Sequence, residues 1–458
     1  MEFSSIIFIF FFLPFSVLIC NVLPLRFKNI SLLFLSMIFL FARGIYAVFY
    51  LAGFSLINYV MLYMTGKYKN HNAVRRLLLF VSVLFDIVFV FICRYGEWFN
   101  CPPNKTWSSQ LVFIGASFCT LSALGTIFEI SRGNLKEELS FLKFTLYLTY
   151  FPKITMGPYI SYDNFFMELK KSDKSLTSYG TGVSAFVKGL AKKVIIADSL
   201  YRLWTAVNMY DPEEISVLTS WLGVLAYSFG IYFTLSGITD MAVGVSEMLG
   251  IVLPFSFNYP SLSMGMKEFS KRWHTTLTKW FSDYIYSPLQ RKEKIANCFV
   301  FILIWGIIGL FYELNLNKFL WGLIIGTASF AESKINKNFY NQLSAFLYAF
   351  IVTSVGWVFF MESSIMDSFK YLKAMLGGTG NIADSSGIYF LKSYIVILLI
   401  AIYASTDLFK NLLEKLKHRK RIDVIVNIVS PVISAALFLT SAALIISNGE
   451  SQQMIIRF

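Results

Sequence analysis

The chain has 458 residues, of which 56% are hydrophobic and only 15% are charged, and its formal net charge is +13. Soluble domains carry about 25% charged residues, and they have no interior large enough to bury 47 phenylalanines. This composition excludes a soluble protein and predicts an all-α, polytopic integral membrane protein, with residues 1–458 forming one domain. Because the cations flank apolar runs, we attribute them to membrane topology and anionic lipid rather than to nucleic acid.

Apolar runs recur along the whole chain, and we expect about 11 of them to cross the membrane. They lie near residues 4–22, 30–51, 53–65, 77–95, 110–130, 141–151, 183–199, 215–235, 296–311, 319–331, 343–361, 388–408 and 423–447. A helical crossing needs about 17–25 apolar residues. The short runs at 53–65, 141–151 and 319–331 are therefore tilted, re-entrant or merged with neighbours. The run at 183–199 contains Lys188, Lys192 and Lys193, so we expect it to lie partly in the interface.

The basic segments that follow three of these runs predict the orientation. Arg26 and Lys28 follow the first run, a basic stretch covers residues 67–76, and another covers 410–423. Basic loops stay in the cytoplasm, which places both termini outside. The first run carries Glu2 and lacks a basic leading segment, so we expect a retained span rather than a cleaved signal peptide.

Two stretches in the middle of the chain contain residues that are unusual within a membrane. Residues 151–170 contain Pro152 and Pro158, which break a straight helix and predict either a loop at the interface or the lining of an internal funnel. Asp240 lies in an otherwise apolar stretch. A carboxylate there is either functional or the partner of a Lys or Arg on another helix.

Residues 267–289, KEFSKRWHTTLTKWFSDYIYSPL, carry the densest pattern. If these residues form one helix, Glu268 and Arg272 lie next to each other on the same face, and so do Lys279 and Asp283. Each pair is four residues apart and is therefore expected to form an ion pair. An aromatic stripe runs beside them through Trp273, Trp280 and Tyr284. The segment therefore predicts an amphipathic helix lying against the bundle.

His274 is the histidine with an apolar, aromatic setting, since His71 and His418 lie in basic loops. A lone buried histidine is more often structural than catalytic, so position by itself does not assign its role. The cysteines show no CxxC pattern, and we expect no metal site.

Several segments, in this order, resemble the membrane-bound O-acyltransferase (MBOAT) family, in particular the bacterial alginate O-acetyltransferase and the D-alanyl transfer protein of teichoic acid synthesis. They are FPKITMGPYISY (151–162), VKGLAKKVIIAD (187–198), YFTLSGITDMAVGVSEMLGI (232–251), LPFSFNYPSLS (253–263) and EFSKRWHTTLTKWFSDYIYSPL (268–289). The likeness covers roughly residues 1–330, with the core at about 110–330 and C-terminal spans at 343–447.

This resemblance implies a curved shell of helices around a central tunnel in the cytoplasmic membrane of a bacterium. An acyl group, acetyl by preference, would pass from a cytoplasmic acyl-CoA or acyl carrier protein to a hydroxyl of an extracytoplasmic polysaccharide or cell-envelope acceptor. No cofactor would be tightly bound, and a companion extracytoplasmic protein often completes the transfer. A histidine would act as general base. The substrate or the tunnel would be contacted by Asp240, Arg272, Trp273, Trp280, Asp283 and Tyr284.

The chain departs from the family pattern where the usual catalytic histidine is expected. That histidine precedes a Trp-Gly pair, here Trp321–Gly322, and Tyr312 stands in its place. Tyrosine has a pKa of about 10, against about 6.5 for histidine. Three interpretations remain open: an acyltransferase that uses His274 or Tyr312 for proton transfer, a non-catalytic MBOAT-like protein, and a small-molecule transporter.

Overall fold

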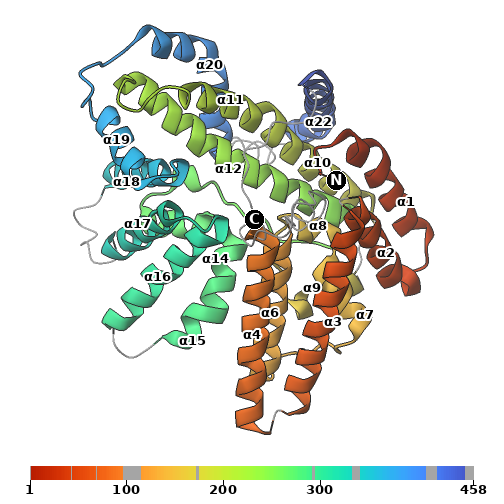
Figure 1. Ribbon diagram of the computed structural model, residues 1–458. Coiled ribbons are helices and arrows are strands. Elements are labelled where there is room, and N and C mark those ends of the chain that lie inside the picture. Colours follow the sequence, from red (N-terminus) through yellow and green to blue (C-terminus); the bar gives the residue numbers. More distant parts are fainter. Residues whose placement is uncertain are drawn as a thin grey trace. The chain divides into compact units, whose positions relative to one another are not determined.

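The computed structural model describes residues 2–42, 44–68, 70–95, 115–171, 175–290, 294–332, 341–408 and 420–448. Within these ranges the secondary structure is helical, with no strand (Figure 1). The predicted outside position of the C-terminus falls beyond the described residues, as does most of the basic stretch at 410–423.

The described chain forms two compact units. The first contains residues up to Phe186 together with Ile238–Phe255, and the second contains Val187–Gly237 together with the chain from Ser256 onward. Helices α10 (Leu176–Ala191) and α12 (Val217–Met248) contribute residues to both units.

The first unit contains the N-terminal helices. They are η1 (Phe8–Phe12), α1 (Leu13–Val22), η2 (Leu25–Phe27), α2 (Lys28–Phe41), α3 (Ile45–Lys67), α4 (Asn72–Tyr95), α6 (Ala116–Arg132), α7 (Phe141–Thr149), α8 (Phe151–Ile154) and α9 (Tyr162–Lys171). Helices α3, α4 and α6 lie side by side (Figure 1). The backbone turns at Gly44, where φ is 136°. Helix α3 begins directly after this turn and contains the whole of the short run at 53–65, so that run is not a separate span.

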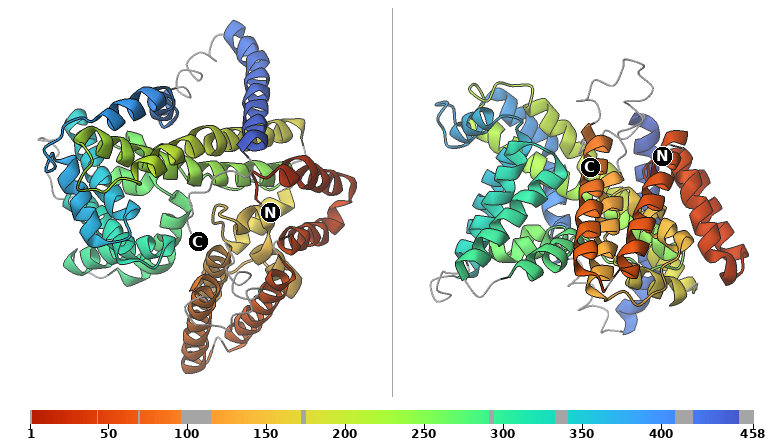
Figure 2. Two further views of the ribbon diagram at one scale, coloured as in Figure 1. Left: turned by 45° about the horizontal axis from the view of Figure 1, so that its top comes forward. Right: turned by 60° about the horizontal axis from the view of Figure 1, so that its bottom comes forward.

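The second unit contains the helices around residues 267–289 and the C-terminal helices. They are η4 (Lys192–Ala197), α11 (Asp198–Val207), η5 (Pro260–Leu262), α13 (Met266–Arg272), α14 (Thr275–Phe281), η6 (Ser282–Tyr286), α15 (Ser287–Leu289), α16 (Lys294–Tyr312), α17 (Leu316–Glu332), α18 (Gln342–Met361), α19 (Ile365–Met375), α20 (Ser385–Ala404) and α22 (Lys420–Asn448). Helices α16 and α17 form an antiparallel pair against which α18 packs, as the further views in Figure 2 show.

Six of the described helices are long and apolar enough to cross a membrane. They are α3, α4, α12, α18, α20 and the Val429–Ser447 part of α22, and three shorter apolar helices cover Phe8–Val22, Lys28–Phe41 and Asn297–Tyr312. Side chains such as Phe11, Phe49 and Phe80 are 66–70% exposed, as expected of helices whose apolar faces meet lipid. The all-helical membrane fold is confirmed.

The segment at 151–170 is broken, as its prolines predict. The short α8 ends at Ile154, and non-helical backbone follows as far as α9. A Cβ at Gly157 would lie 2.4 Å from the carbonyl oxygen of Pro152. The chain therefore folds back on itself here, and only glycine permits this close approach.

The α16–α17 pair depends on glycines that let the two backbones touch. A Cβ at Gly322 would lie 2.0 Å from the carbonyl oxygen of Trp305, and one at Gly309 would lie 2.0 Å from that of Lys318. Small residues of this kind are how membrane helices approach closely enough to pack.

We therefore expect Gly322→Ala to destabilise the protein by about 1–3 kcal/mol or more, because the new methyl group must push α16 away. Thermal unfolding in one detergent measures the effect. Gly53→Ala on α3 is the matched control, since its Cβ would meet nothing within 4 Å, and alanine there should be neutral or stabilising by up to about 1 kcal/mol. Equal melting temperatures for the two variants would contradict the close packing of α16 on α17.

Candidate active site

The prediction that residues 267–289 form one continuous amphipathic helix is wrong. Helix α13 ends at Arg272, Trp273 is extended, and His274 takes the left-handed conformation with φ 42° and ψ 56° before α14 begins. Two backbone hydrogen bonds hold this break, from the Asn258 N–H to the Arg272 carbonyl (3.1 Å) and from the Thr275 N–H to the Ser256 carbonyl (2.6 Å). In a continuous helix, the Arg272 carbonyl and the Thr275 N–H would bond within the helix. Here they bond instead to backbone groups of residues 256–258.

Left-handed backbone is unusual for a histidine. Residues other than glycine pay roughly 1–2 kcal/mol for this conformation, and such costs cluster at functional sites. Among the described residues, only Tyr259 and His274 combine a non-glycine side chain with positive φ. The surrounding contacts therefore hold the backbone of His274 in a conformation that it would not adopt by itself.

The His274 side chain is buried, with 1% of the residue exposed. Its ring lies 5.2 Å from the ring of Phe257 and 6.4 Å from that of Tyr312, measured between centroids. It stands between α13 and α14 and outside the membrane-spanning helices. Burial lowers the pKa of His274 to about 4, because the charged imidazolium would lose its hydration. The imidazole is therefore neutral at physiological pH and able to accept a proton.

Tyr312, at the C-terminal end of α16, is also fully buried. Its hydroxyl accepts a hydrogen bond from the Trp273 indole N–H (3.1 Å). A phenol that accepts one hydrogen bond still has its own proton to donate, so the Tyr312 hydroxyl can act as a hydrogen-bond donor. The structure therefore brings together the two residues that the sequence offered as proton-transfer groups.

An aromatic cluster supports Trp273 and Tyr312 from α17 and α18. Trp357 lies 5.1 Å from Trp273, and Phe360 lies 5.5 Å from Tyr312, between ring centroids. Trp321, of the Trp-Gly pair, lies 5.8 Å from Tyr312. Rings packed edge to face in this way resist displacement, so the Tyr312 hydroxyl is held in place by three helices.

The other predicted site residues are placed differently. Arg272 pairs with Glu268 as predicted (2.6 Å). Among the ion pairs of the described residues, none joins Lys279 to Asp283. Helix α14 passes into the π-helix η6 at Ser282, which changes the helical spacing between the two residues.

The aromatic stripe is partly confirmed. Trp273 and Trp280 are each 2% exposed, whereas Tyr284, in η6, is only half-buried. Asp240 is buried on α12 within the first unit, while the residues around His274 belong to the second.

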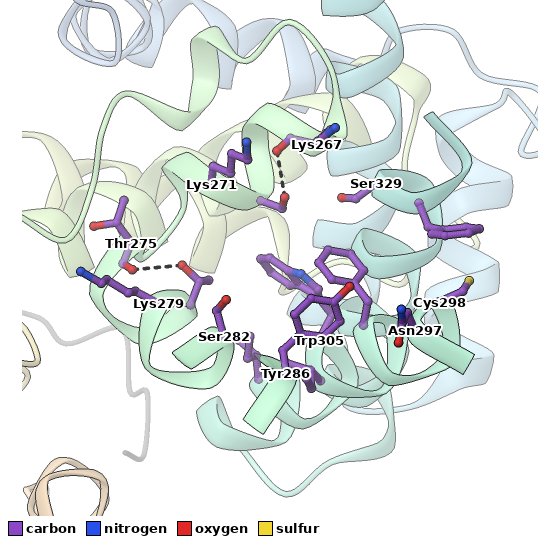
Figure 3. Close-up of a pocket in the computed structure, with 16 residues that line it drawn as sticks. Lys267, Lys271, Thr275, Lys279, Ser282, Tyr286, Asn297, Cys298, Trp305 and Ser329 are labelled. Atoms are coloured by element: carbon purple, nitrogen blue, oxygen red, sulfur yellow. Dashed lines mark hydrogen bonds between the residues drawn. The ribbon is translucent and has the colours of Figure 1, made fainter. Parts of the chain in front are cut away.

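A cavity of about 550 Å³ lies in the second unit, between α13 and α14 on one side and α16 and α17 on the other (Figure 3). Lys267, Lys271 and Lys279 lie along its polar side, while Trp305, Ile308 and Phe301 line its apolar side. It reaches Thr275 and Thr278, which adjoin His274, but neither His274 nor Tyr312 lines it.

Sequence reasoning missed two contributors to this arrangement. Phe257 packs against both Trp273 and His274, and its place in the LPFSFNYPSLS segment gave no sign of this contact. The lysines of the cavity did carry a signal, since Lys267 and Lys271 are four residues apart on α13. The third lysine of the cavity, Lys279, was predicted to pair with Asp283, so the sequence did not suggest a cluster of three unpaired lysines.

The sequence is similar to one protein-family model and to several known bacterial proteins. The model of the MBOAT, membrane-bound O-acyltransferase family matches residues 29–364. A probable alginate O-acetylase of Pseudomonas aeruginosa is 26% identical over 404 residues, covering 84% of this chain and 76% of that protein. A peptidoglycan O-acetyltransferase of Helicobacter pylori is 27% identical over 82% of this chain and 80% of its own length. A teichoic acid D-alanyltransferase of Bacillus subtilis is 27% identical over 53% and 64%.

Proposed function

The chain belongs to the membrane-bound O-acyltransferase family, and we propose that it transfers an acyl group, acetyl by preference, to a hydroxyl of an extracytoplasmic polysaccharide or cell-envelope acceptor. The acyl donor is a cytoplasmic thioester, acyl-CoA or acyl carrier protein. Similarity to proteins named for acting on alginate, peptidoglycan and teichoic acid supports this class of acceptor. A companion extracytoplasmic protein completes the transfer.

The same proposal includes the setting of the enzyme. It lies in the cytoplasmic membrane of a bacterium, with both termini outside and about 11 helices forming a curved shell around a tunnel. The six candidate spans and three shorter apolar helices of the described residues support a polytopic arrangement.

His274 carries the proposed chemistry, and the observation behind it is a buried imidazole held next to Tyr312. The imidazole takes the proton of the acceptor hydroxyl while that oxygen attacks the thioester carbonyl. The Tyr312 hydroxyl, positioned by Trp273, donates a hydrogen bond to the oxyanion that forms. The carbon–sulfur bond then breaks, and the leaving thiolate receives the proton from His274.

The test is transfer by the purified full-length protein in liposomes, measured as thiol release from acetyl-CoA or an acyl carrier protein in the presence of polysaccharide. With His274 as base, the rate should be flat between about pH 6 and 8 and fall as the imidazole is protonated near its pKa of about 4. If tyrosine were the base, the rate would still be rising above pH 8, because a phenol keeps its proton until strongly alkaline pH.

The second candidate function is binding without catalysis, and the tyrosine at position 312 favours it. Thioester binding without thiol release from any donor, at any pH, would establish this second function. In that case Tyr312→His is the informative variant, because it returns histidine to the position where the family has one.

A further inference from the structure

The cavity of the second unit has a cationic rim. Lys267, Lys271 and Lys279 are exposed at its edge, and none of their ammonium groups pairs with a carboxylate of the described residues. Glu332 is the nearby acid, and it accepts a hydrogen bond from the Lys267 backbone N–H (3.0 Å) rather than from the side chain. Three positively charged residues thus lie at the edge of one cavity.

The opposite side of the same cavity is apolar and consists mainly of buried side chains. Ile304, Trp305 and Ile308, all on α16, are only 1–6% exposed. Phe301 and Tyr286 are half-buried near the opening. In Figure 3 the lysines stand at the top and left, while Tyr286 and Trp305 lie at the bottom. The cavity volume of about 550 Å³ is in the range of small-molecule sites.

We propose that this cavity binds an anionic phospholipid, with the head group at the edge that carries the three lysines and the first part of an acyl chain along the α16 wall. Charge complementarity carries the assignment, because a zwitterionic or uncharged lipid would leave three cations uncompensated. Hydroxyl groups of Ser270, Thr275 and Ser282 also line the cavity and suit the ester and glycerol oxygens of such a lipid.

A thioester donor also carries phosphates, but the position of the reacting groups argues against it as the occupant. Neither His274 nor Tyr312 lines the cavity, so a thioester held there would not meet the imidazole. A phospholipid has no such requirement, and the surrounding bilayer supplies it at high local concentration.

The proposal is tested by native mass spectrometry of the full chain after delipidation. Phosphatidylglycerol should bind one molecule per chain, and phosphatidylcholine should bind at least about tenfold more weakly. Replacing Lys267, Lys271 and Lys279 together by Gln should weaken phosphatidylglycerol on the order of 10²-fold, since each lysine near an anionic head group contributes about fivefold. Phe301→Ser should weaken the lipid but not inorganic phosphate.

The matched control removes three lysines elsewhere, Lys136, Lys373 and Lys392, which are also exposed and do not line the cavity. Its affinity for phosphatidylglycerol should stay at the wild-type value. Equal losses in both triple variants would overturn the proposal, because they would show a general effect of charge. One-for-one displacement of the lipid by acetyl-CoA would overturn it too and would assign the cavity to the donor. Neither result depends on whether the protein transfers acyl groups.

Discussion

His274→Asn is expected to reduce acyl transfer by about 10²–10⁴-fold, the usual contribution of a general base. Asparagine is chosen over alanine because it tolerates the left-handed backbone at this position, where φ is 42°. The variant should therefore keep the wild-type melting temperature and thioester affinity. The rate is measured as thiol release at a saturating concentration of the acyl donor. The affinity for the donor is measured separately and should not change.

Two further variants serve as controls for His274→Asn. Tyr259→Asn makes the same kind of change at the other left-handed residue, where φ is 47°, and should leave the rate within a few-fold of wild type. Tyr312→Phe removes the proposed hydrogen-bond donor to the oxyanion but leaves the general base in place, so it should cost less than His274→Asn. If transfer instead survives His274→Asn and collapses in Tyr312→Phe, the tyrosine performs the proton transfer.

Breaking the ion pair of Lys193 with Asp198 is expected to have the largest effect on stability. The two side chains are 4% and 10% exposed, and their charged atoms are 2.5 Å apart. They are five residues apart, and the π-helical turn of η4 brings them together because its hydrogen bonds also span five residues. Asp198→Ala should cost about 3–5 kcal/mol, because it leaves a buried lysine without its main counter-charge.

An exposed pair and a double variant complete that experiment. Lys171 and Glu168 lie 2.6 Å apart with side chains 60% and 19% exposed, so Glu168→Ala should cost less than about 1 kcal/mol. The double change Lys193→Met with Asp198→Leu should recover most of the lost stability, since apolar groups can replace a buried pair. Thermal unfolding in a single detergent measures all three variants. Similar melting temperatures for Asp198→Ala and Glu168→Ala would show that water reaches the Lys193 pair.

The sequence alone determined the membrane class, the helical fold and most of the apolar helices. These features follow from local physics: a bilayer requires long apolar stretches whose backbone bonds are satisfied within the helix, and both properties can be counted along the chain. The same local reasoning predicted the break after the prolines of 151–170 and the Glu268–Arg272 pair.

Only the tertiary structure decided the features that depend on residues distant in sequence. Lys193 looked like an interfacial cation, but a π-helical turn buries it against Asp198. The helix expected at 267–285 is broken at His274, because backbone groups at 256–258 compete for its hydrogen bonds. Tyr312 is 38 residues beyond His274, and the folding of α16 against α17 places its ring beside the imidazole. Hydrophobic periodicity shows which face of a helix is apolar. It does not show which other helix packs against that face, or which buried residue becomes the partner of a given side chain.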